Sequence, residues 1–220
     1  MNPNDYDKTA YIVGGGSSLI GFDWKILDDP TKFVVAINSS HLVLPNCNLI
    51  YLTDPPYIES NLTTLTNHSA PVWQGVLNMN VPPKLPVVDK QIHLVAANGF
   101  IDDPDPYKVA HGSNSTFACL QLLVKLGWTT IYLLGIDMKW GTCGDKNTSH
   151  WHSDLHPHSN IDSEIVYRTM LANYNTIKQP LLDRGITVIN VNTENGTMLK
   201  VFPIQSLEST FGITNINSSR

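Results

Sequence analysis

Short, almost continuously apolar runs recur along the chain and are separated by polar segments. They are rich in Val, Ile, Leu and Tyr. Strands that are buried on both faces of a parallel sheet have this composition. The expected strands are YIVG (residues 11–14), KFVVAIN (32–38), NLIYLTD (48–54), IHLVAA (92–97), TIYLLGID (130–137) and TVINVN (187–192).

Two segments between these runs have the apolar spacing of helices. Residues 115–126, STFACLQLLVKL, begin among candidate N-cap hydroxyls and precede Gly127, which is typical of a helix end. Residues 161–182 carry apolar side chains at helical spacing, and Pro180 is expected to end or kink that helix. Residues 55–90 are rich in Pro, Asn and Thr, which favours irregular loops or short edge structure.

The alternation of strands and helices predicts the fold class. Strand, helix, strand units imply right-handed crossovers, and therefore an α/β fold with a single doubly wound, mainly parallel, Rossmann-like sheet. Neither a repeat nor a domain boundary is visible, so we expect one domain over residues 1–220. A long lid loop is expected over residues 138–160. The expected neighbouring strands are Tyr11–Gly14, Phe33–Ile37, Leu49–Leu52 and Ile131–Leu134.

Composition and charge narrow the class of protein. Of the 220 residues, 42% are hydrophobic and 15% charged, which is usual for a folded globular chain. The net charge of −5 comes without a block of Lys and Arg, which argues against a wide nucleic-acid surface. We expect no secretory leader, since the first residues lack a basic segment followed by an apolar stretch, and no apolar run comes near the roughly 20 residues of a membrane helix. We therefore expect a cytoplasmic protein without a transmembrane segment.

A glycine-rich loop follows the first expected strand. Gly14, Gly15 and Gly16 precede Ser17 and Ser18. In a doubly wound sheet, ligands bind beyond the carboxyl ends of the strands, where glycine amides and serine hydroxyls can hold a phosphate. The spacing matches neither the dinucleotide nor the Walker pattern, so a tight turn without a ligand is the alternative.

Polar residues at other strand ends and at one helix start complete the candidate site. The run VVAINSS ends in Asn38 and Ser39, LLGID ends in Asp137, and Asn114 and Ser115 begin the first expected helix. Because such ends meet at one edge of a parallel sheet, these residues are candidates for binding a nucleotide. Asx turns and loop caps are the structural alternatives.

The segment SHWHSDLHPHSN, residues 149–160, holds four of the eight histidines. Histidine transfers protons near neutral pH, so acid–base catalysis is the leading interpretation of this segment. A metal site and a bare loop remain alternatives, but the spacing matches no standard metal motif and we assign no metal. The side chains of interest are those of His152, His158, Trp151 and the nearby Trp140.

The stretch SNSTFACLQLLVKLGWTTIYLLGIDMKW resembles the core segment of the bacterial lipooligosaccharide sialyltransferases. It is similar also to a wider hydroxymethylpterin pyrophosphokinase-like group. In both, a strand leads to a Gly-Asn-Gly-Pro-Ser-Leu loop, which GGGSSL resembles, and a later strand ends in Asn. HSNIDSEIVYRTML and GITVINVNTENGTMLKVFP resemble the sialyltransferase tail. The resemblance runs from residue 11 to 203, with residues 55–109 poorly matched.

This resemblance implies a metal-independent glycosyltransferase. In it, residues 14–18 contact the nucleotide and its phosphate, Asn38 binds the donor or its base, and Ser115 faces the donor sugar. His158 is the general base, with His152 in reserve. The family's loop Asn and Pro are Gly15 and Ser17 here, so we expect a nucleotide-linked donor of unspecified sugar.

The expected partners follow from this activity. They are a nucleotide-sugar donor, used as substrate with no further cofactor, and an acceptor that is a saccharide or another hydroxyl compound. A modified DNA base is a less favoured acceptor, and homo-oligomerisation is left open. A pyrophosphokinase that uses ATP and Mg²⁺ held by Asp54 and Asp137, or a non-catalytic nucleotide-binding module, are the alternative functions.

Overall fold

The structure is a computed structural model, and it describes residues 1–77, 84–139, 151 and 163–212. Its centre is a sheet of nine strands, and all neighbouring strands are parallel. The α/β, doubly wound fold predicted from the sequence is therefore confirmed. The strands are β1 (Thr9–Val13), β2 (Phe33–Ile37), β3 (Leu49–Leu52), β4 (Val72–Leu77), β5 (Lys90–Val95), β6 (Lys108–Ala110), β7 (Thr130–Leu134), β8 (Thr187–Val191) and β9 (Ile204–Gln205).

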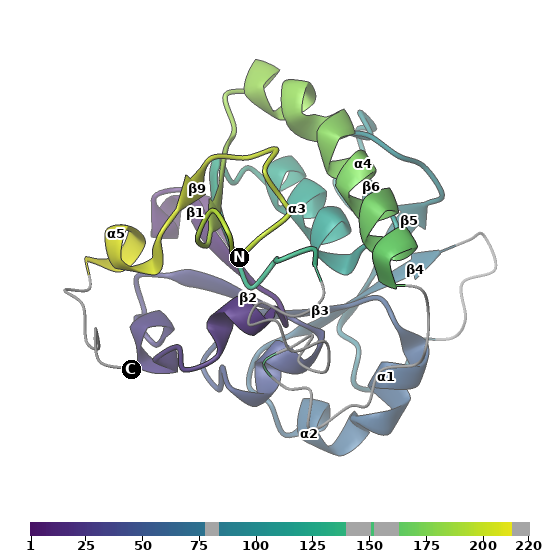
Figure 1. Cartoon of the computed structure of the whole chain (residues 1–220). Helices are drawn as coiled ribbons and strands as arrows, with labels where there is room; N and C mark the ends of the chain where they lie inside the picture. The colour runs from purple at the N-terminus through teal and green to yellow at the C-terminus, as the bar shows by residue number, and fades with distance from the viewer. Residues whose placement is uncertain (78–83, 140–150, 152–162, 213–220) are drawn as a thin grey trace.

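Helices cover both faces of the sheet (Figure 1). One layer lies over one face and a second layer, with short 3₁₀ turns, lies over the other, so the sheet is the middle of three layers. The first layer is α3 (Ser115–Lys125) and α4 (Ser163–Asp183); the second contains α1 (Pro55–Ser60) and α2 (Leu62–Thr66); α5 (Leu207–Phe211) follows β9. The 3₁₀ turns are η1 (Pro3–Tyr6), η2 (Ser17–Leu19), η3 (Trp24–Leu27) and η4 (Asn38–Leu42).

Successive residues of a strand point to opposite faces of the sheet, so alternate residues pack into two separate hydrophobic cores. In β2, Val35 packs with the α3 and α4 layer, whereas Val34 packs with the α1 and α2 layer. All five residues of β2 are buried, which explains its continuous apolar composition. Trp128, fully buried in the first core, stacks on Phe33 with ring centroids 4.2 Å apart.

The order of strands is β6-β5-β4-β3-β2-β1-β7-β8-β9. The chain moves outward from β1 to β6, returns along α3, and adds β7 on the other side of β1. The four strands predicted to be neighbours are neighbours, because β3, β2, β1 and β7 follow one another.

The expectation for residues 55–90 was wrong in part. This region contains α1, α2 and β4, and β4 lies inside the sheet between β3 and β5. Its sequence VWQGVL was hard to recognise because Gln74 and Gly75 interrupt the apolar run. Gln74 is nevertheless buried, and a Cβ on Gly75 would come within 2.7 Å of the Tyr51 hydroxyl. Among the described residues, no helix is long and apolar enough to cross a membrane.

Candidate functional site

The carboxyl ends of β1 and β7 form the topological switch point of the sheet. The chain leaves β1 toward β2 on one side, and β7 lies on the other side. Ligands of doubly wound proteins bind in the crevice where neighbouring connections diverge in this way. The glycine loop follows β1 and residues 135–138 follow β7, so two predicted segments meet here.

Two of the three glycines allow the ends of β1 and β7 to touch. The Gly14 amide donates to the Leu134 carbonyl and the Gly16 amide to the Gly135 carbonyl, both at 2.8 Å. A Cβ on Gly14 would lie 2.4 Å from Ile136 Cδ1, and one on Gly16 would lie 2.6 Å from the Gly135 oxygen. The glycines are therefore required by close packing within the protein, whatever ligand binds nearby.

Asp137 fastens the glycine loop from the β7 side. Its Oδ2 accepts the Ser18 amide at 2.9 Å, and its Oδ1 accepts the Ser18 hydroxyl at 2.6 Å and the Asn192 side-chain amide at 2.8 Å. The residue is 4% exposed, and burial raises the pKa of its carboxyl above the ordinary value, against the lowering effect of these hydrogen bonds. At Ser18, the anion expected for this turn is thus a carboxylate of the protein itself.

The end of β2 turns sharply at Asn38. This residue has φ +49°, and its carbonyl accepts a hydrogen bond from His41 Nδ1 at 2.8 Å. Ser39 and Ser40 are buried in the same turn, and the Ser40 hydroxyl donates to the Gly14 carbonyl at 3.1 Å. The Asn38 segment therefore lies against the glycine loop. Among the described residues, the Asn38 Oδ1 is buried without a hydrogen-bond partner.

The amino terminus of α3 lies over the end of β3. Asn114 Oδ1 accepts the Phe117 amide at 3.0 Å, as an N-cap does, and also the Tyr174 hydroxyl at 3.0 Å. The Ser115 hydroxyl is hydrogen-bonded to that of Thr53, the residue after β3. Asn114 thus serves to orient α3, and the first-turn amides of this helix face the carboxyl edge of the sheet.

Strained backbone gathers at this edge. Asn38, Ser113 and Met138 are non-glycine residues in the left-handed region, with φ +49°, +57° and +51°. They flank the ends of β2, α3 and β7, whereas the other two such residues of the described chain, Asp7 and Lys8, precede β1. Left-handed conformations of residues with side chains cost energy and cluster at functional sites.

The predicted residues therefore lie in a row along one edge of the sheet. Ser115 is at the end of β3, Asn38 at the end of β2, the glycine loop at the end of β1 and Asp137 at the end of β7. Neighbouring strands are about 4.8 Å apart, so the row spans about 15 Å. Within the described residues no hydrogen bond joins Ser115 to the glycine loop.

Trp151 packs on the glycine loop. Its amide donates to the Gly15 carbonyl at 2.9 Å and its Nε1 to the Gly14 carbonyl at 3.2 Å, while its ring lies 5.3 Å from that of Trp24. Through Trp151, one residue of the histidine-rich segment therefore contacts the switch point. The other predicted residues of that segment, His152, His158 and Trp140, lie outside the described residues.

Several residues of the site were missed by the sequence reasoning. Tyr167 on α4 is partly buried, and burial together with the charge of Asp137 raises the pKa of its phenol. In the sequence, its helical spacing to Tyr174 indicated a side chain packed on the core-facing side of a helix, and nothing indicated a place in the site. Asn192 follows β8 as Asn38 follows β2, so a polar residue after a buried strand was the available signal.

One cavity of about 170 Å³ lies away from this row. It is mostly apolar, and the ring of Trp24 in its wall lies 5.3 Å from that of Trp151. Its wall is formed by Trp24, Lys25, Leu27, Asp28, Val34, Val43, Leu44, Pro45, Asn46 and Cys47. Its wall contains none of the predicted site residues that the structure describes.

The fold and the site define a doubly wound α/β protein with a row of polar residues at the strand ends around its switch point. Comparison of the chain with protein-family models, with curated proteins and with solved structures found no match. In the parts of the chain that the structure describes, no group of three or more His, Cys, Asp or Glu could hold a metal ion.

Proposed function

We propose that this protein is a glycosyltransferase that moves a sugar from a nucleotide-linked donor to a hydroxyl acceptor. The observation that carries the proposal is the row of polar groups and strained residues at the switch point, between Ser115 and Asp137. Ligands of doubly wound proteins bind beyond the strand ends at the switch point, and nucleotides are common among them. The resemblance to the sialyltransferases adds the reaction type.

The two ends of the row suit different parts of the donor. Glycosyl transfer passes through an oxocarbenium-like state while a phosphate departs, and the departing charge needs hydrogen-bond donors. The first turn of α3, with Ser115, supplies amides and a helix dipole for that phosphate. The glycine loop and Asn38 would then contact the nucleoside.

The acceptor hydroxyl must lose its proton as the new bond forms. We assign this to His158, with His152 as the second candidate, because imidazole accepts protons near pH 7. Trp151 and Trp140 would stack on the acceptor or the base. The acidic net charge of −5 favours a saccharide over a DNA base as acceptor.

A Mg²⁺-dependent pyrophosphokinase is the second candidate. It would need carboxylates such as Asp54 and Asp137 for the metal ion. The oxygens of Asp137 already accept three hydrogen bonds, so a metal ion there would have to displace Ser18 or Asn192. This arrangement favours the glycosyltransferase.

A screen of ligands tests the proposal. CMP, UMP, UDP, ATP with Mg²⁺ and several nucleotide sugars are compared by thermal shift, and the ligands that bind enter transfer assays with and without EDTA. A ligand at 100 times its Kd stabilises the fold by about 2.7 kcal/mol, which is easily measured. Transfer in EDTA supports the proposal. Strict dependence on ATP and Mg²⁺ supports the pyrophosphokinase, and binding without turnover supports a non-catalytic module.

A further inference from the structure

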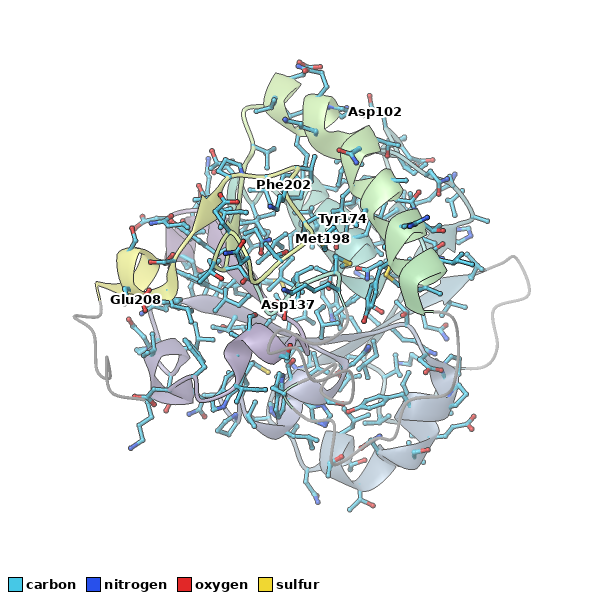
Figure 2. The ribbon with its side chains drawn as sticks, viewed as in Figure 1. Asp102, Asp137, Tyr174, Met198, Phe202 and Glu208 are labelled. Atoms are coloured by element: carbon cyan, nitrogen blue, oxygen red, sulfur yellow. The ribbon has the colours of Figure 1, made fainter. Side chains whose placement is uncertain are left out.

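A buried carboxylate takes the place of a bound anion at the glycine loop. Turns that follow a β-strand commonly offer an amide and a hydroxyl to a phosphate. Here the Ser18 amide and hydroxyl both donate to Asp137, at 2.9 and 2.6 Å. Figure 2 places Asp137 where the layers of the molecule meet, near Met198, whose amide donates to the Asp137 carbonyl at 2.8 Å.

We infer that Asp137 is a positioning residue, a resident anion whose carboxylate fixes the glycine loop and keeps phosphate away from the Ser18 end of that loop. Three loops depend on it, because Ser18 follows β1, Asp137 itself follows β7 and Asn192 follows β8. The inference rests on the proposed function only in naming a nucleotide as the ligand.

The glycine loop packs directly against the Asp137 carboxylate, which already holds the Ser18 donors. A Cβ on Gly16 would lie 2.6 Å from Asp137 Cγ, so loop and carboxylate are already in contact. A phosphate that approached Ser18 would also meet the carboxylate charge at short range in a buried setting, where repulsion is strong. The glycine loop is therefore suited to an uncharged part of the donor, such as the base or ribose.

The surroundings of Asp137 keep it in this arrangement. The Thr197 hydroxyl donates to the Asp137 carbonyl at 3.1 Å, and the Asn192 amide holds Oδ1. Among the described residues, the ionisable groups that act on it are Lys139, whose charge favours the carboxylate, and Tyr167, whose phenol is kept neutral. Loss of the carboxylate would release Ser18, so the loop would keep only its other bonds, such as that from the Gly16 amide to the Gly135 carbonyl.

Chemical rescue tests the inference. Asp137→Ala removes the carboxylate and leaves space for formate, and Asp137→Asn keeps the side-chain volume if the alanine variant does not fold. Asp89→Asn is the matched control, since Asp89 also accepts a backbone amide, that of Val72 at 2.7 Å, at the opposite edge of the sheet.

The first readout is the Ser18 amide resonance, which needs no nucleotide. In Asp137→Ala we expect its chemical shift to change, and to go back to the wild-type value when sodium formate is added. In the wild type, inorganic phosphate should leave the chemical shift unchanged. The second readout is affinity for CMP and UMP, which should fall by about tenfold in both Asp137 variants. Formate should restore it in Asp137→Ala alone, and Asp89→Asn should match the wild type.

Two results would overturn the inference. One is a Ser18 resonance that shifts with phosphate in the wild type, which would make the loop a phosphate site. The other is a resonance unchanged by loss of the carboxylate. A wild type that binds neither CMP nor UMP would contradict the proposed nucleotide binding. If the Ser18 resonance still responds to formate as expected, the inference that Asp137 is a resident anion is supported all the same.

Discussion

Close packing against the segment after β7 explains why glycine stands at positions 14 and 16, and the sequence pattern alone could not show this. A glycine-rich turn after a strand is equally consistent with a ligand and with close packing of the backbone. The neighbours of these two residues, Ile136 and Asp137, come from a segment more than a hundred residues later. Only the pairing of β1 with β7 brings the two segments together.

The general base gives a prediction at the scale of one residue. His158→Ala should lower kcat by about two to four orders of magnitude, because acid–base help contributes that much. Donor affinity should stay near the wild-type value, since the base touches the acceptor. Turnover and donor binding are measured separately, and His150→Ala is the control from the same segment. If His158→Ala is fully active and His152→Ala is not, the general base is His152. If both variants are fully active, this segment takes no part in the mechanism.

His41 gives a prediction about pH. It is 3% exposed, its Nδ1 donates to the Asn38 carbonyl, and burial lowers its pKa below the ordinary value of 6.5. The unfolded chain therefore binds a proton at a higher pH than the folded one. The stability that neutral His41 contributes is complete above pH 6.5 and is lost as the pH falls toward the folded pKa.

The measurement is the melting temperature between pH 7.5 and 5.5. The wild type should lose stability on acidification, and His41→Gln should lose less over the same interval, whatever its starting stability. Burial also lowers the pKa of His111, so part of the acid effect should persist in the variant. Equal slopes for the two proteins would contradict the assignment to His41.

At the scale of an element, α3 depends on a single cap. Asn114 Oδ1 accepts both the Phe117 amide and the buried Tyr174 hydroxyl. Asn114→Ala should cost about 1–3 kcal/mol of unfolding free energy, since it removes the cap and leaves the buried Tyr174 hydroxyl with Thr116 as its remaining partner. Tyr174→Phe alone should cost about 1 kcal/mol.

The double variant separates these two effects. Once Ala occupies position 114, Tyr174→Phe removes a hydroxyl that has already lost its bond to Asn114, so it should cost less than it does in the wild type. Urea unfolding of the four proteins gives the coupling. Additive losses would show that the hydroxyl of Tyr174 is satisfied in another way. Asn114→Asp, which retains the acceptor, serves as the control.

Helix α4 contains a proline, Pro180, near its carboxyl end. The sequence predicted a helix over residues 161–182 that Pro180 ends or kinks; α4 does not end at Pro180 but continues to Asp183. Pro180 removes one amide from the helix, but Ile177 and Leu181 on either side are buried against the first core. The burial of this face offsets the loss of one hydrogen bond.

For the whole molecule, the sequence was sufficient for the class of fold and for the central four strands. Strands such as Phe33–Ile37 are buried on both faces, and their composition records that burial directly. β4, β6 and β9 were missed, because Gln74 and Gly75 interrupt one and the other two are only three and two residues long.

The site was predictable as a set of strand ends and not as a set of contacts. Polar residues after buried strands indicated Asn38 and Asp137, but the contacts at this edge join segments that are distant in sequence. Ser18 and Asn192 bind Asp137, and Ser40, beside Asn38, binds the Gly14 carbonyl. The role of Asp137 illustrates the difference. As a residue it was a candidate ligand-binding group, and in the structure its carboxylate is bonded within the protein.

The placement of β1 has a consequence for how this chain is made. Thr9 pairs with Thr130, so one edge of the central strand stays open until about 120 further residues have been translated. At about 5–20 residues per second this interval lasts roughly 6–24 seconds. During it, β1 presents unpaired amides and carbonyls that the same strand of another nascent chain can match. Polysomes, where such chains emerge side by side, are therefore the setting in which this protein is most exposed to misassembly.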